Sequence, residues 1–193
     1  MKKLLLVFTA LFLMSGFAAA QDDFTEHLYG KGQASWAVAS ESDFENGWAT
    51  LFGVGYDFND YIALEIESGF VTFDVENVVL NRGTGKIETV PLLFNIVAGY
   101  PWEQYKPYAT IGIGYAFNDF NSNTTGLKAD PKNSILGKFG VGIDYYYADN
   151  VAIFFEGSYL LNAGDTTFKL DGNSKDYSNL STWLIGGGIK LRF

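Results

Sequence analysis

The chain has 193 residues, a formal net charge of −9 and no cysteine, and 17% of its residues are aromatic. The acidic balance excludes partners that need a basic surface, such as nucleic acid, and the lack of cysteine excludes disulfides and thiolate metal sites. Beyond the N-terminal region, no stretch approaches the ~18 consecutive apolar residues of a membrane-spanning helix, so any further crossing would have to use strands.

The first twenty residues have the pattern of a secretory signal peptide. Lys2 and Lys3 precede an apolar run that extends to Phe17, and small residues follow it up to Ala20. The run is too short for the alternative, a transmembrane anchor. We therefore predict that residues 1–20 are a signal peptide that is cleaved on export.

Cleavage after Ala20 would leave residues 21–193 as a single domain, which is long enough to bury a substantial core. Without the two lysines of the signal, 11 basic residues remain against 22 acidic ones, a formal charge of −11. This balance also argues against anionic lipid as a specific partner.

Alternation of apolar and polar or small residues recurs along the chain and predicts strands, because successive side chains of a strand point to opposite faces. Eight segments have this pattern: 32–40, 48–58, 61–70, 90–100, 108–117, 135–147, 151–160 and 180–193. The connections at 59–60, 101–106 and 148–150 are short. The segments 74–86, 120–134 and 163–178 are long and polar, and we expect them to be loops at the opposite end.

This arrangement fits two architectures. A soluble lipocalin-like barrel would turn its apolar faces inward, whereas an outer-membrane barrel turns them toward lipid and has short turns at one end and long loops at the other. Strands of about 9–11 residues would suit a tilted bilayer crossing.

Three features favour the membrane barrel. The short motifs "GVGYDF", "GIGYAF", "GVGIDY" and "GGGIKL" place pairs of glycines on the polar face, where a narrow interior needs small residues. Export without disulfides is the second feature. The third is two groups of aromatic residues at strand ends, as in interfacial girdles. They are Tyr56, Phe58, Tyr100, Trp102, Tyr145 and Phe193 at the short-turn end, and Trp36, Trp48, Phe70, Phe117, Tyr159 and Trp183 toward the long loops.

The segment "KPYATIGIGYAF" and the terminal "GGGIKLRF" resemble the small outer-membrane β-barrel superfamily of Gram-negative bacteria, which includes OmpA-, OmpX- and OmpW-type proteins. The resemblance implies an all-β, eight-stranded antiparallel up-and-down barrel in the outer membrane, in contact with its lipid and lipopolysaccharide. It also implies that Ile189, Leu191 and Phe193 form the signal read by the barrel-assembly machinery. Full OmpA-type proteins carry a peptidoglycan-binding domain after the barrel, and we expect none in this protein.

Charged residues on the predicted inner face are the main candidate site. In a narrow barrel they should pair into a network that plugs the interior, and the alternative is that one pair opens as a gate for ions or small solutes. A charged lumen also differs from the apolar tunnel expected of the OmpW type. The predicted network comprises Glu65, Glu67, Lys138, Asp144, Glu156, Lys190 and Arg192.

Catalysis has little support in the sequence. The single histidine, His27, precedes the first predicted strand, at the periplasmic end rather than beside a serine or carboxylate on the outer side. We expect no enzyme activity, no cofactor and no metal site. Three functions stay open: a monomeric structural or surface-interaction protein that binds an extracellular ligand through its loops, a narrow pore or transport protein, and a lipid-modifying enzyme.

Overall fold

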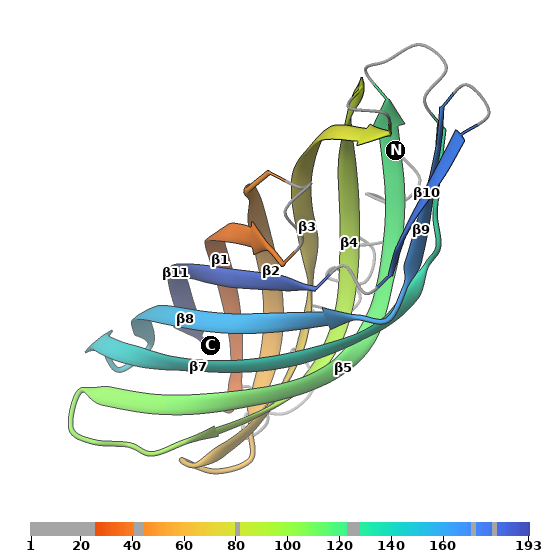
Figure 1. The fold of residues 1–193 in the computed structure, drawn as a ribbon. Helices are drawn as coiled ribbons and strands as arrows, with labels where there is room; N and C mark the ends of the chain where they lie inside the picture. The colour runs from red at the N-terminus through yellow and green to blue at the C-terminus, as the bar shows by residue number, and fades with distance from the viewer. Residues whose placement is uncertain (1–25, 41–44, 80–81, 123–127, 171–172, 179–180) are drawn as a thin grey trace.

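Eight antiparallel strands close into a barrel in the computed structural model, which describes residues 26–40, 45–79, 82–122, 128–170, 173–178 and 181–193 (Figure 1). Around the barrel the strand order is β1-β11-β8-β7-β5-β4-β3-β2. This confirms the predicted fold class; the predicted signal peptide lies outside the described residues. The barrel strands are β1 (Leu28–Ala39), β2 (Gly47–Asp57), β3 (Ile62–Val79), β4 (Arg82–Gly99), β5 (Tyr105–Ser122), β7 (Ser134–Ala148), β8 (Val151–Asn162) and β11 (Thr182–Arg192).

Alternation along each strand separates an inner from an outer face, as the sequence pattern predicts. On β2, for example, Ala49 and Leu51 are buried inside the barrel, whereas Trp48 and Phe52 are exposed on its outer wall. Among the described residues, no helix is long and apolar enough to span a membrane.

The three segments predicted as long loops contain much more strand than expected. β3 continues to Val79 and β4 begins at Arg82, so most of 74–86 is a strand hairpin, and β5 reaches Ser122. The predicted strand length of about 9–11 residues is therefore wrong for β3, β4 and β5, which have 18 residues each. Cross-strand pairing, such as that of Asp74 with Lys86, satisfies the backbone here in spite of the polar composition.

The other two segments form a second sheet. β6 (Lys128–Pro131), β9 (Asp165–Leu170) and β10 (Asn173–Ser178) pair in the order β10-β9-β6. In Figure 1 the β9–β10 hairpin rises beside the upper part of β5, beyond the barrel. We call these three strands the accessory sheet. The interpretation of 120–134 and 163–178 as plain loops is thus also wrong in large part.

Apolar side chains, nearly all of them aliphatic, fill the inside of the barrel in its half away from the short turns. Leu51, Leu93 and Leu184 have no exposed surface there. We call this group the apolar layer, and it fills the passage between the strands. Its members are Ala37, Ala49, Leu51, Val71, Phe73, Leu93, Ala116, Leu136, Leu160 and Leu184.

The outer wall is apolar and edged with aromatic rings. Trp36 and Trp48 meet edge to face at 4.7 Å near one end of the barrel, and the Tyr159 and Trp183 rings lie 4.7 Å apart in the same region. Tyr56 and Phe58 meet at 5.2 Å near the short-turn end. These pairs lie in the two aromatic groups that the sequence predicts.

Candidate functional site

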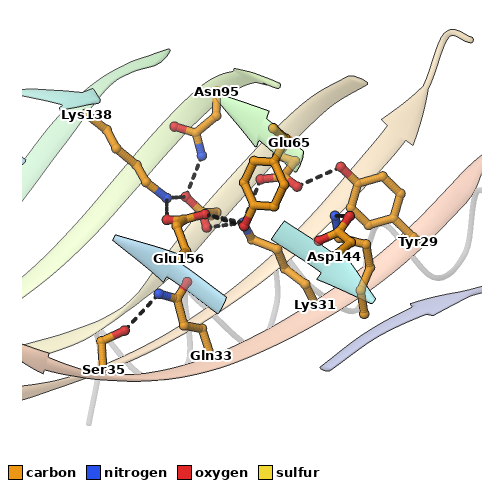
Figure 2. Close-up of polar contacts among 12 residues, drawn as sticks. Tyr29, Lys31, Gln33, Ser35, Glu65, Asn95, Lys138, Asp144 and Glu156 are labelled. Atoms are coloured by element: carbon orange, nitrogen blue, oxygen red, sulfur yellow. Dashed lines mark hydrogen bonds and ion pairs between the residues drawn. The ribbon is translucent and has the colours of Figure 1, made fainter. Parts of the chain in front are cut away.

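Three glutamates and two lysines meet inside the barrel. Figure 2 shows Lys31, Lys138, Glu65 and Glu156 of this cluster. Lys31 Nζ lies 2.7 Å from a Glu65 oxygen, 2.6 Å from Glu67 and 4.0 Å from Glu156. Lys138 Nζ lies 2.7 Å from Glu67 and 2.8 Å from Glu156. Strands β1, β3, β7 and β8 each supply part of this cluster, so it joins opposite walls of the barrel.

Neutral donors complete the carboxylate contacts. The Tyr29 hydroxyl donates to Glu65 at 2.7 Å, and the Tyr108 hydroxyl donates to Glu156 at 3.0 Å. The Asn95 side-chain amide donates to Glu67 at 2.5 Å. Since buried charge is tolerated only when it is paired and hydrogen-bonded, these donors are part of what makes the cluster stable.

A second set of charges lies nearer the short turns. Lys190 Nζ is 2.8 Å from Asp144 and lies over the rings of Tyr29 and Tyr108, at 4.8 and 5.3 Å from their centroids. Arg192 is 2.9 Å from Asp57 and is one-third exposed. Lys106 also faces Asp57, at 3.8 Å. We call the cluster and this second set together the ionic layer.

The ionic layer is electrically balanced among the described residues. Its five cations face five carboxylates, and the side chains at its centre have almost no exposed surface. An interior filled in this way supplies its own counterions. The members are Lys31, Lys106, Lys138, Lys190, Arg192, Asp57, Glu65, Glu67, Asp144 and Glu156.

All seven residues of the predicted network lie on the inner face, and all seven contact another charged residue of the layer. Six of them are buried and Arg192 is half-buried. The structure therefore brings the set together as a single layer.

Sequence reasoning missed Lys31, which contacts more carboxylates than any other cation of the layer. The first strand was predicted to begin at position 32, whereas β1 begins at Leu28. Extending the alternation back from Gln33 by one step would have placed Lys31 on the inner face. Lys106 and Asp57 were missed because each lies at the end of a strand, beside a short connection.

His27 is exposed next to the short-turn end, and its ring lies 5.7 Å from the Tyr56 ring. Within the described ranges, no group of three or more histidine, aspartate or glutamate side chains is arranged to hold a metal ion. The predicted assembly signal lies at the C-terminal end of β11, where its three side chains are exposed. These are Ile189, Leu191 and Phe193.

Comparison with solved structures places the fold among small outer-membrane barrels. OprG from Pseudomonas aeruginosa superposes with a TM-score of 0.64 at 15% identity, over 86% of this chain and 95% of that one. Neisserial surface protein A gives 0.62 at 15%, over 86% and 97%. Outer membrane protein W from E. coli gives 0.52 at 21%, over 88% and 98%. At these identities the likeness concerns the fold alone.

No curated protein sequence matches the chain. The outer membrane protein beta-barrel domain family, in contrast, matches residues 6–193, which is nearly the whole sequence. The closed eight-stranded barrel, its apolar outer wall and its paired interior charges agree with that match. The chain belongs to the outer membrane protein β-barrel domain family.

Proposed function

We propose that the protein is a monomeric integral barrel of the outer membrane, exported with its signal peptide, whose barrel is a closed scaffold for an extracellular contact surface. The observation that carries this proposal is the filled interior, since Glu67, Lys138 and Glu156 in one layer and Leu51 and Leu184 in the other have no exposed surface. A filled barrel leaves the parts outside the membrane to make contacts.

The contact surface that we propose consists of the accessory sheet and the extended ends of β3, β4 and β5. The β9–β10 hairpin pairs with β6 and also approaches β3, so it is tied to the barrel wall. Its sequence, from Asp165 to Ser178, is rich in Thr, Asn, Ser, Lys and Asp. A polar sequence of this kind, carried by a folded scaffold, suits recognition of a polar surface.

The test is to replace residues 165–178 by a glycine–serine linker and to measure adhesion of cells that display the protein. The probes are a layer of cultured epithelial cells and a polystyrene surface. We expect adhesion to fall at least several-fold, while heat-modifiable migration on gels shows that the barrel still folds. A matched control replaces residues 101–104, at the short-turn end, and should leave adhesion unchanged. Full adhesion by the hairpin variant would refute the proposal.

A narrow pore is the second candidate, because ion pairs inside the barrel could exchange partners and admit ions or small solutes. Planar-bilayer conductance of the refolded protein separates the two functions. Discrete current steps whose size or selectivity changes in Glu65→Gln/Glu67→Gln would favour the pore. Silence from a folded and inserted sample would favour the closed scaffold.

We also propose that Ile189, Leu191 and Phe193 are read by the barrel-assembly machinery and that the apolar outer wall contacts membrane lipid and lipopolysaccharide. The exposed, alternating placement of the three side chains supports the first point. Replacing Phe193 by Ser should lower the amount of inserted barrel in cells without lowering the stability of protein refolded in vitro by more than ~1 kcal/mol.

A further inference from the structure

The interface between β1 and β11 differs electrostatically from the rest of the barrel. Lys31 on β1 lies directly opposite Lys190 on β11, and both side chains are buried on the inner face. Both ammonium groups also lie within 6.0 Å of the centroid of the Phe154 ring. Like charges in directly opposed positions destabilise a strand pair. We call this interface the seam.

The two strands of the seam contribute only cations to the interior. Neither the β1 sequence, LYGKGQASWAVA, nor the β11 sequence, TWLIGGGIKLR, contains an aspartate or a glutamate. Lys31, Lys190 and Arg192 are therefore three positive charges on neighbouring strands. No charge within the seam itself compensates for them.

Every carboxylate that holds these cations comes from another strand. Glu65 and Glu67 on β3 hold Lys31, and Glu156 on β8 lies 4.0 Å from it. Asp144 on β7 holds Lys190, and Asp57 on β2 holds Arg192. The attraction that closes the seam thus acts through the lumen and not along the seam.

Cross-strand side-chain packing adds little in the middle of the seam. Gln33, Ala34 and Ser35 of β1 lie opposite three consecutive glycines of β11, positions 186–188. Cross-strand pairs are a main source of stability between strands, and a glycine supplies no side chain for them. Backbone hydrogen bonds and the distant carboxylates are left to hold this part of the seam.

We propose that the seam is a conditional closure, which stays shut only while the carboxylates of β2, β3, β7 and β8 hold the cations of β1 and β11. When those carboxylates lose their charge, the barrel opens first between β1 and β11 and not elsewhere in the wall. The device is independent of whether the lumen conducts or the accessory sheet adheres.

The test is hydrogen exchange of the refolded protein in lipid vesicles, resolved by strand. In Glu65→Gln/Glu67→Gln we expect amides of β1 and β11 to exchange about tenfold faster or more, while amides between β7 and β8 keep their protection. Adding Lys31→Gln removes one of the two opposed charges and should restore most of the protection. Glu88→Gln, which neutralises an exposed outer carboxylate, is the charge-matched control and should change nothing.

A cross-link gives a second readout, and the absence of native cysteines makes it specific. Gly32→Cys/Ile189→Cys joins opposed outer positions across the seam, and Gly157→Cys/Val141→Cys joins a like pair between β8 and β7. In the Glu65→Gln/Glu67→Gln background, the seam disulfide should restore protection of β1 and β11 and the other disulfide should not. If the double variant does not insert, Glu65→Gln alone, with and without Lys31→Gln, supports the same comparison.

An equal rise of exchange in all strands would overturn the proposal, since the carboxylates would then be stabilising the barrel as a whole. Failure of Lys31→Gln to restore protection would overturn it as well, because the repulsion between the two lysines would not be the cause. Unchanged exchange in the glutamine variants would show that the seam needs no carboxylates.

Discussion

In the half of the interior near the short turns, paired charges fill the barrel, whereas in the other half apolar side chains fill it. The difference between the layers lies in what each depends on. Leu184 packs against apolar neighbours and needs no particular partner among them. Its contribution to stability therefore depends on the apolar area that it buries. Lys138 depends on Glu67 and Glu156, which come from two other strands. We therefore expect the ionic layer to contribute to which strands face each other, and the apolar layer to contribute to how tightly they pack.

The largest expected effect comes from breaking the ionic layer at its centre. Lys138→Met leaves Glu67 and Glu156 sharing Lys31 as their only cation within hydrogen-bonding or ion-pair distance among the described residues. Removal of one partner from a buried pair costs about 3–5 kcal/mol. Urea unfolding of the refolded protein in vesicles, followed by tryptophan fluorescence, measures this loss. A loss below ~1 kcal/mol would mean that the cluster contributes little to stability.

Next in size is a cavity in the apolar layer. Leu184 is fully buried, and Leu184→Ala should cost about 2–5 kcal/mol, depending on how far its neighbours collapse into the space. The same unfolding measurement applies. Combined with Lys138→Met it tests the independence of the layers, because distant sites add to within ~0.5 kcal/mol. A strongly non-additive double variant would show that the two layers act as one.

A smaller effect is expected at the edge of the ionic layer. The Arg192–Asp57 pair is close, at 2.9 Å, but the Arg192 side chain is one-third exposed. Solvent screening limits such pairs, so Arg192→Gln should lower the free energy of unfolding by about 1 kcal/mol or less. A loss as large as that of Lys138→Met would contradict the contrast between the buried centre and its edge.

The smallest expected effect is an increase, not a loss, in the free energy of unfolding. Thr110 is buried on the inner face, and its hydroxyl has no hydrogen-bond partner in the part of the chain that the structure describes. Thr110→Val keeps the shape and removes an unsatisfied polar group, so the variant should be equally stable or up to ~1 kcal/mol more stable. Destabilisation by more than that would indicate that a bound water satisfies the hydroxyl.

The sequence predicts the barrel and most of its charged interior because strand alternation is a local property. Glu65 and Glu67, two positions apart on one strand, must face the same side whatever the rest of the chain does. The pairing of Glu67 with Lys138 could not be predicted, since it depends on the order and register of strands 71 residues apart. Alternation also places Leu51 and Leu93 on the polar face of their strands, but their packing with the other members of the apolar layer depends on the same strand order and register and was not predicted.

The accessory sheet could not be predicted for another reason. Residues 165–178 have few apolar residues, so their alternation carries no hydrophobic signal. Only the pairing of β9 with both β10 and β6 makes these segments strands. These strands therefore form because of pairing between distant segments, whereas their composition alone would favour a loop.

Because the strands differ in length, the wall of the barrel is taller on one side than on the other. At about 3.3 Å per residue, β3, β4 and β5 extend over ~60 Å, whereas β1, β2 and β11 cover only ~36–40 Å. Figure 1 shows the long strands and the β9–β10 hairpin rising together on one side. A large body such as an antibody or a neighbouring cell surface would therefore meet a tall wall on the side of β3, β4 and β5 and a much lower wall on the side of β1 and β11. The direction of approach decides whether such a body first contacts the tall side of the barrel or the low side.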